Sequence, residues 1–133
     1  MITFLLHLCV YYLLAIGSYS DLKTRLVSNK LIGCIALFSL PLIILNLEYI
    51  TYLHIITIVA LLSIYYITHY LGIPSIGGAD VKVLPIIILS VTTSQLIIGF
   101  LIAAGLNNIL MYKYRNGVPF FICITVGYMV TLW

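Results

Sequence analysis

The sequence predicts an all-α polytopic membrane protein, a bundle of six transmembrane helices in a single membrane-embedded domain (residues 1–133). Two observations lead to this fold. The chain is 64% hydrophobic and only 7% charged, and its mean hydropathy is +1.25, well above the values of soluble domains. Because a spanning helix takes about 20 residues, a chain of 133 residues accommodates about six spans joined by short loops.

The charged residues divide the chain into the predicted helices. All six basic and three acidic residues fall in four places: Asp21 to Lys30, Glu48, Asp80 to Lys82, and Lys113 to Arg115. The apolar segments between the charges, with one further break at the polar run 92–95, predict spans at about 2–20, 31–47, 51–71, 81–95, 96–112 and 117–133. Some of these spans are short, which indicates a thin or tilted bundle.

The basic residues predict the orientation of the helices in the cell membrane. The first, third and fifth loops hold every Lys and Arg, whereas the second carries only Glu48 and the fourth is uncharged. Loops rich in positive charge stay in the cytoplasm, so both termini are predicted to lie outside. Asp21, at the end of the first span, and Asp80, at the start of the fourth, then share the cytoplasmic side. Glu48 lies on the other side and is not a candidate for the same site.

Two aspartates on one side of the membrane can form a catalytic pair. Taken singly, Asp21 could offset Lys23 and Arg25, and Asp80 could cap a helix. Held together, two carboxylates share a proton, because they cannot both ionise cheaply. The ionised one can take a proton from water while the protonated one polarises a carbonyl, which is the chemistry of peptide hydrolysis. Lys23 and Lys82 each follow an aspartate by two residues and are predicted to shape the site.

A segment of small residues leads into Asp80. Gly77 and Gly78 have no Cβ and Ala79 has only a methyl group, so a second backbone can approach this segment closely. A protease needs such a place, because its substrate lies against it as an extended strand. Gly77, Gly78 and Ala79 are therefore predicted to form a turn that admits the substrate backbone to Asp80.

The remaining residues indicate no cofactor. The three cysteines stand singly in apolar segments and no H-E-x-x-H motif occurs, so no metal site is predicted. The basic residues form no extended run, which argues against a nucleic-acid partner and leaves membrane lipid as the expected surroundings. His7 and His54 are expected to be structural, while His69, ahead of Asp80, is the histidine nearest the pair.

Three stretches of the sequence carry a resemblance to one known family. Asp21 to Asn29 is an aspartate followed by basic residues and a Val-Ser-Asn element, and Gly77 to Lys82 reads G-G-A-D-V-K. Val118 to Phe121, followed by Gly127, is a Pro-Phe element after a basic loop. These stretches resemble the type IV prepilin peptidases and archaeal preflagellin peptidases, which are G-x-G-D-type intramembrane aspartyl proteases. Two positions depart from the family pattern: Ser28 stands where a Pro is usual, and Ala79 where the second glycine is expected.

The resemblance implies a function and a substrate. Asp21 and Asp80 would be the catalytic pair, with water as the nucleophile. The substrate would be a precursor of a type IV pilin-like or archaellin-like protein, which carries a short basic leader ahead of an apolar helix and is cut on the cytoplasmic side. The bifunctional members of the family also carry a cytoplasmic domain with C-x-x-C motifs. This sequence has no such motif, so the resemblance implies a peptidase without methyltransferase activity. The small size and Ala79 favour an archaeal-type enzyme, with a short bacterial pilus peptidase as the alternative.

Two alternatives remain open from the sequence. One is a protease that cuts within a helix, in the manner of presenilins or signal peptide peptidases, which resemble this chain only at the second stretch. The other is a non-enzymatic membrane subunit or transporter fragment in which Asp21 and Asp80 bind an ion or relay protons. The second alternative requires polar groups through the bundle, and the side opposite the aspartates offers little beyond Glu48 and Gln95.

Overall fold

The computed structural model describes residues 1–24, 26–72, 78–113 and 120–131. These residues form six α-helices and one 3₁₀-helix: α1 (Ile2–Thr24), α2 (Asn29–Leu45), η1 (Leu47–Tyr49), α3 (Tyr52–Tyr70), α4 (Gly78–Ser90), α5 (Thr93–Lys113) and α6 (Phe120–Val130). The predicted all-α bundle of six helices is confirmed. Three of the helices are long and apolar enough, by length and composition alone, to cross a membrane: α1, α3 and Thr93–Leu110 of α5.

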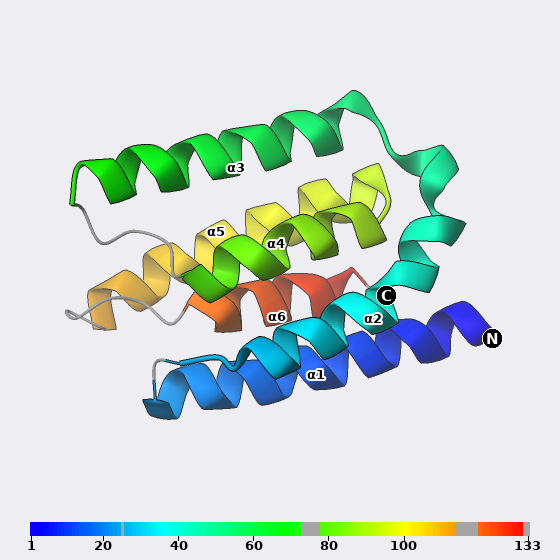
Figure 1. Cartoon of the computed structure of the whole chain (residues 1–133), viewed down its shortest axis with the longest axis horizontal. Helices are drawn as coiled ribbons and strands as arrows, with labels where there is room; N and C mark the ends of the chain where they lie inside the picture. Colours follow the sequence, from blue (N-terminus) through cyan, green and yellow to red (C-terminus); the bar gives the residue numbers. More distant parts are fainter. Residues whose placement is uncertain (25, 73–77, 114–119, 132–133) are drawn as a thin grey trace.

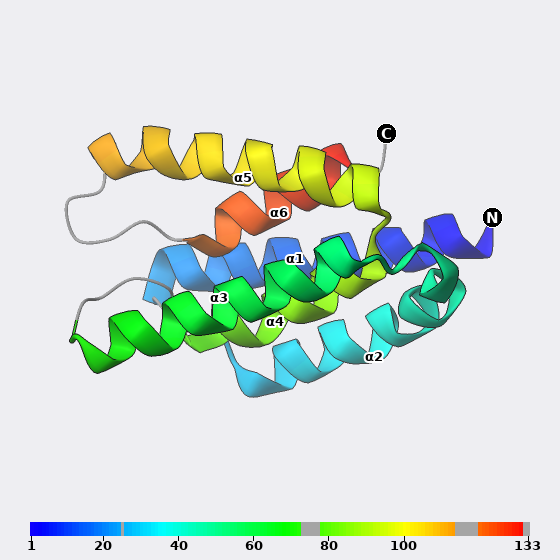
Figure 2. The ribbon, with the colours of Figure 1, turned by 90° about the horizontal axis from the view of Figure 1, so that it is seen from above.

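Successive helices run in alternating directions along one long axis (Figures 1 and 2). The C-terminal ends of α1, α3 and α5 lie at the same end of the bundle as the N-terminal ends of α2, α4 and α6. We call this the aspartate end, because α1 ends and α4 begins there. The N-terminus of the chain and the end of α6 lie at the opposite end (Figure 1).

Apart from Glu48 in η1, the charged residues that the structure describes lie in terminal turns of the α-helices rather than in loops between them. α1 continues to Thr24, so Asp21 and Lys23 belong to its last turn, and α4 begins at Gly78 rather than at residue 81 as expected. The partial charges of a helix account for this placement in part. A helix N-terminus favours an acid such as Asp80 in its first turn, and a C-terminus favours a base such as Lys23 in its last turn.

The boundary between α4 and α5 also differs from the expected one. α4 ends at Ser90 and α5 begins at Thr93, whereas the sequence predicted spans meeting at residues 95 and 96. The Gln95 side chain accepts a hydrogen bond from the Thr92 backbone N–H at 3.0 Å. This is one half of a capping box, in which the residue at the third helical position satisfies the backbone ahead of the helix. The polar run 92–95 is therefore a helix start and not a four-residue loop.

α4 lies at the centre of the bundle and packs against α2, α3 and α6. Its inward residues belong to one apolar core with side chains of α1, α2 and α6. The members from α4 are Val83, Ile87 and Ile88, and Val91 directly follows the helix; all four are nearly or fully buried. On the outside, α1, α3 and α5 expose large apolar side chains, among them Leu5, Ile56 and Leu101. An apolar core together with an apolar outer surface is what a helical bundle in lipid requires.

The C-terminal end of α4 is held by the side chains of two residues, one just after α2 and one in α3. Asn46, which follows α2, donates from Nδ2 to the Ser90 carbonyl at 2.8 Å. His54 is fully buried, accepts the Thr51 backbone N–H at Nδ1 and therefore donates from Nε2 to the Val91 carbonyl at 3.1 Å. The last carbonyls of a helix need such partners where water is scarce. His54 thus has the structural role that the sequence predicted.

α5 and α6 cross with their backbones in contact. A Cβ built on Gly127 would lie 2.6 Å from the Gly99 carbonyl oxygen, and one on Gly99 would lie 3.2 Å from the Gly127 carbonyl oxygen. Glycine at both positions is what allows two helices to approach so closely in lipid.

Replacing Gly127 by alanine should therefore separate α5 from α6 and destabilise the protein by about 1–3 kcal/mol, the usual cost of overpacking. Thermal unfolding of the purified protein in detergent measures this change. Gly105 is the matched control, because a Cβ there meets no atom within 4 Å. Gly105→Ala should change stability by less than about 1 kcal/mol, and equal effects of the two substitutions would contradict the backbone contact.

Candidate active site

Asp80 is buried in the first turn of α4. Its side chain is only 6% exposed, although aspartate is rarely buried without partners. The carboxylate lies close enough to the buried thiol of Cys123 in α6 to interact with it electrostatically. The first half of α6 therefore borders Asp80, although these two residues are far apart in the sequence.

Asp21 lies in the last turn of α1 and is half-buried. One turn earlier on α1, the buried Ser18 hydroxyl contacts the Thr125 hydroxyl of α6 at 2.6 Å. Thr125 also donates to the Leu14 carbonyl of α1 at 3.2 Å. Because residues three apart share a helix face, this polar contact fixes the face of α1 that carries Asp21 against α6.

The structure brings the two aspartate-bearing helix ends to the same end of the bundle (Figures 1 and 2). α1 packs against α2 and α6, and α4 packs against the same two helices. The two helix ends therefore share two neighbours, which fix their relative position. Asp21 and Asp80 differ in environment, since one is half-buried at a helix C-terminus and the other is buried at a helix N-terminus.

Local hydrogen bonds shape the connection that follows Asp21. Ser20 Oγ donates to the Leu26 carbonyl at 2.7 Å, and Thr24 Oγ1 donates to the Ser20 carbonyl at 2.9 Å. Ser28 is the N-cap of α2 and accepts the Leu31 N–H at 3.2 Å. Its φ of −69° is the value to which a proline ring is fixed, so the backbone here suits either residue. A serine in place of the usual proline therefore keeps the local conformation and adds a helix cap.

A hydrogen bond joins the two stretches that follow the aspartates. The Lys82 ammonium donates to Asn29 Oδ1 at 3.0 Å, which links the start of α4 to the start of α2. Residues two apart point to different sides of a helix, so Lys82 does not share the face of Asp80. Asn29 is a site-region residue that sequence reasoning did not single out. In the sequence, Asn29 could have been noticed because it ends the first stretch that resembles the peptidase family, Asp21 to Asn29.

A comparison with protein families identifies the chain. A model of the type IV leader peptidase family matches residues 8–112, which contain Asp21, Asp80 and the Asn29–Lys82 hydrogen bond. The chain belongs to the type IV leader peptidase family. No curated protein and no solved structure matches this peptidase.

The glycine segment of this leader peptidase falls partly within the described residues. Gly78 is the first residue of α4, and Ala79 lies in its first turn, half-buried and packed against the core. The expected turn through Ala79 is therefore replaced by helix, because α4 starts three residues earlier than predicted. Gly77 lies outside the described residues, as do Val118 and Pro119 of the third resembling stretch, which is also outside the matched range.

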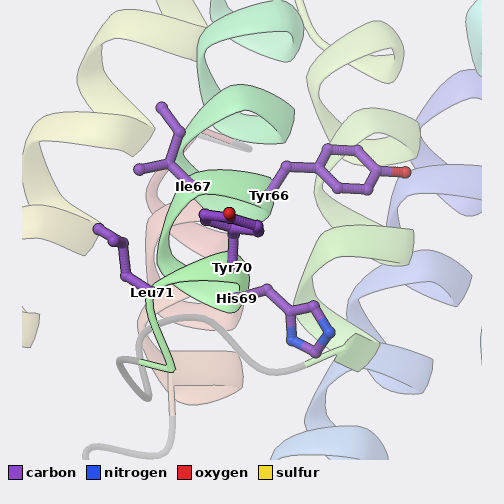
Figure 3. A pocket seen from close by; sticks show the side chains of 5 residues that line it. All are labelled: Tyr66, Ile67, His69, Tyr70 and Leu71. Carbon is purple, nitrogen blue, oxygen red and sulfur yellow. The ribbon is translucent and has the colours of Figure 1, made fainter.

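The histidines of the peptidase lie in three different surroundings. His7 Nδ1 lies 2.6 Å from the hydroxyl of the buried Tyr128, which ties α1 to α6 near the opposite end of the bundle. His69 lies in the last turn of α3, is exposed, and stacks on Tyr65 with ring centroids 5.8 Å apart. It borders a shallow pocket of about 480 Å³ around the end of α3, where its ring points away from Ile67 and Leu71 (Figure 3).

The Asn29–Lys82 hydrogen bond can be tested by a double-mutant cycle. Asn29→Ala and Lys82→Met should each lower the free energy of unfolding by about 0.5–1 kcal/mol. In the double variant this free energy should be little lower than in either single variant. Thermal unfolding in detergent gives these values. Lys30→Met removes a neighbouring exposed charge and serves as the control. Fully additive losses from Asn29→Ala and Lys82→Met would show that the two side chains act independently.

Proposed function

We propose that this peptidase is an aspartic endopeptidase in which Asp21 and Asp80 activate a water molecule between them. The observation that carries the proposal is the placement of the helix ends that bear these two acids at one end of the bundle, supported by the same two neighbouring helices. Both acids lie within the residues that match the type IV leader peptidase family. The remaining acid, Glu48, lies in η1, between α2 and α3 at the opposite end.

The different surroundings of the two acids support a division of roles. Two carboxylates that share a proton need one member ionised, to take a proton from water, and one protonated, to polarise the scissile carbonyl. Burial penalises charge on Asp80, while its place at a helix N-terminus favours that charge. Asp21 lies at a helix C-terminus, which disfavours a negative charge on its side chain. Such unequal environments hold one proton on a pair of acids without a metal ion.

The substrate in this proposal is a type IV pilin-like or archaellin-like precursor with a short basic leader ahead of an apolar helix. The aspartate end would face the cytoplasm, because Lys23, Lys30, Lys82 and Lys113 all lie in helix turns at this end. The cut would then fall at the cytoplasmic membrane face. The peptidase family supports this substrate class over a helix-cutting protease of the presenilin type.

An ion- or proton-binding subunit is less consistent with the inward face of α1. The opposite half of the bundle holds more polar groups than the sequence indicated, including His7, Asn46 and Tyr128. Between His7 and Ser18, however, the inward positions of α1 are Val10 and Leu14, both fully buried. A transport route needs polar groups or water along its length, and these two side chains interrupt the face that would carry one.

Replacing either catalytic acid should abolish cleavage. Asp21→Asn and Asp80→Asn should each lower the rate by about 10³-fold or more, and the double variant should be no slower, because a pair that acts as a unit is lost with either member. The measurement is the conversion of a pilin-like precursor, with its leader, to the shorter product in membranes that contain each variant.

Glu48→Gln is the matched control for this experiment. It also removes one carboxylate, but at the opposite end of the bundle, and should leave the rate unchanged. Retained cleavage in either aspartate variant would overturn the catalytic pair. Equal loss in the Glu48 variant would show that the effect is one of net charge or folding.

A further inference from the structure

A long apolar groove runs between α3 and α5, with α4 and α6 as its floor. Its volume is about 640 Å³. Figure 2 shows this face of the bundle, with α3 and α5 on either side and α6 visible between them. On α3 the lining extends from Leu53 to Ile64 and on α5 from Gln95 to Asn108, which at 1.5 Å per residue corresponds to a length of about 16–20 Å. A groove of this length and direction fits one helix lying parallel to the bundle.

We propose that this groove holds the apolar helix of the precursor, so that the peptide bond ahead of that helix is presented to Asp80. This inference rests on the proposed function. The occupant is an apolar helix, because the walls are apolar side chains that remain open to the outside: Ile56 is 62% exposed and Phe100 56% exposed. A groove open along its length lets a membrane helix enter sideways from the lipid.

The floor of the groove is continuous with the catalytic acid. α4 contributes Leu84, Ile87 and Ile88 to the lining, and Val91 directly after the helix adds to it. Asp80 precedes these residues by 4, 7, 8 and 11 positions, which is the spacing of one face of an α-helix. Asp80 therefore lies on the same stripe of α4 that floors the groove, one turn beyond Leu84. A helix seated on this stripe ends beside Asp80.

Polar groups line the groove where the substrate has to unwind. Asn107 and Asn108 lie near the aspartate end of α5, at the depth of Ile64 on α3 and Leu84 on α4. A protease cuts an extended segment, and a peptide that leaves its helix in an apolar setting frees N–H and C=O groups that need partners. The exposed side-chain amide of Asn108 offers both a donor and an acceptor there. A lipid chain in the groove would make no hydrogen bond to this amide.

Photo-crosslinking tests the occupant directly. A photoreactive amino acid at Ala60 or Ala104, which line the groove, should cross-link the precursor through its apolar helix in full-length Asp80→Asn protein. The matched controls are the adjacent positions Val59 and Gly105, which do not line the groove. Val59 is 56% exposed, and a Cβ on Gly105 meets nothing within 4 Å. These controls should give little or no cross-linked precursor.

A kinetic measurement on the active enzyme separates binding from folding. Ala104→Phe should raise KM for the full precursor about tenfold while kcat stays within about twofold, because it fills the groove and leaves the acids in place. A short peptide that spans the cleavage site without the apolar helix should be cut at an unchanged rate. Gly105→Phe should leave both substrates unaffected.

The outcomes distinguish this inference from the proposed function. Wild-type protein that cleaves no precursor contradicts the peptidase activity on this substrate class. Wild-type protein that cleaves, with equal cross-linking from Ala104 and Gly105, contradicts the groove alone. Cross-links from the groove positions to lipid only, or to a second copy of the chain, also overturn the inference.

Discussion

The position of α4 depends on hydrogen bonds that come from its neighbours. This helix has 13 residues, about 20 Å in length, which is shorter than the hydrocarbon core of a bilayer. Pro85 also removes one backbone N–H from its interior. Side chains of Asn46 and His54 bind its C-terminal carbonyls, and Asn29 binds Lys82 near its start. Asp80 and part of the floor of the groove belong to α4, so these contacts help to set the positions of both.

The arrangement of the helices followed from where the charges lie in the sequence. Apolar length predicted the number of helices, and the charged clusters at the aspartate end predicted which helix ends would meet. These are properties of chain length and solvation, which a sequence displays directly. The same reasoning reached Asp21 and Asp80 as candidates, because so few acids occur in the chain. Their roles in catalysis stay a prediction.

The details that sequence reasoning missed depend on single side chains. The starts of α4 and α5 were misplaced because polar residues at a membrane boundary were assigned to loops, although Gln95 caps a helix. Asn29, Ser18 and Thr125 were not expected at the site because their partners lie 53 to 107 positions away along the chain. Contacts of this kind are set by tertiary packing, which periodicity and composition do not encode.

The backbone contact between Gly99 and Gly127 makes the two walls of the groove mechanically unequal. α5 lies directly on α6, and no side chain separates them that could compress or rotate away. α3 packs chiefly on α4 and touches α5 only slightly. If the groove widens, α3 is therefore the helix that moves, while α5 stays in place. In mechanical terms the groove has one wall, α5, that is fixed against α6, and one wall, α3, that is held less tightly.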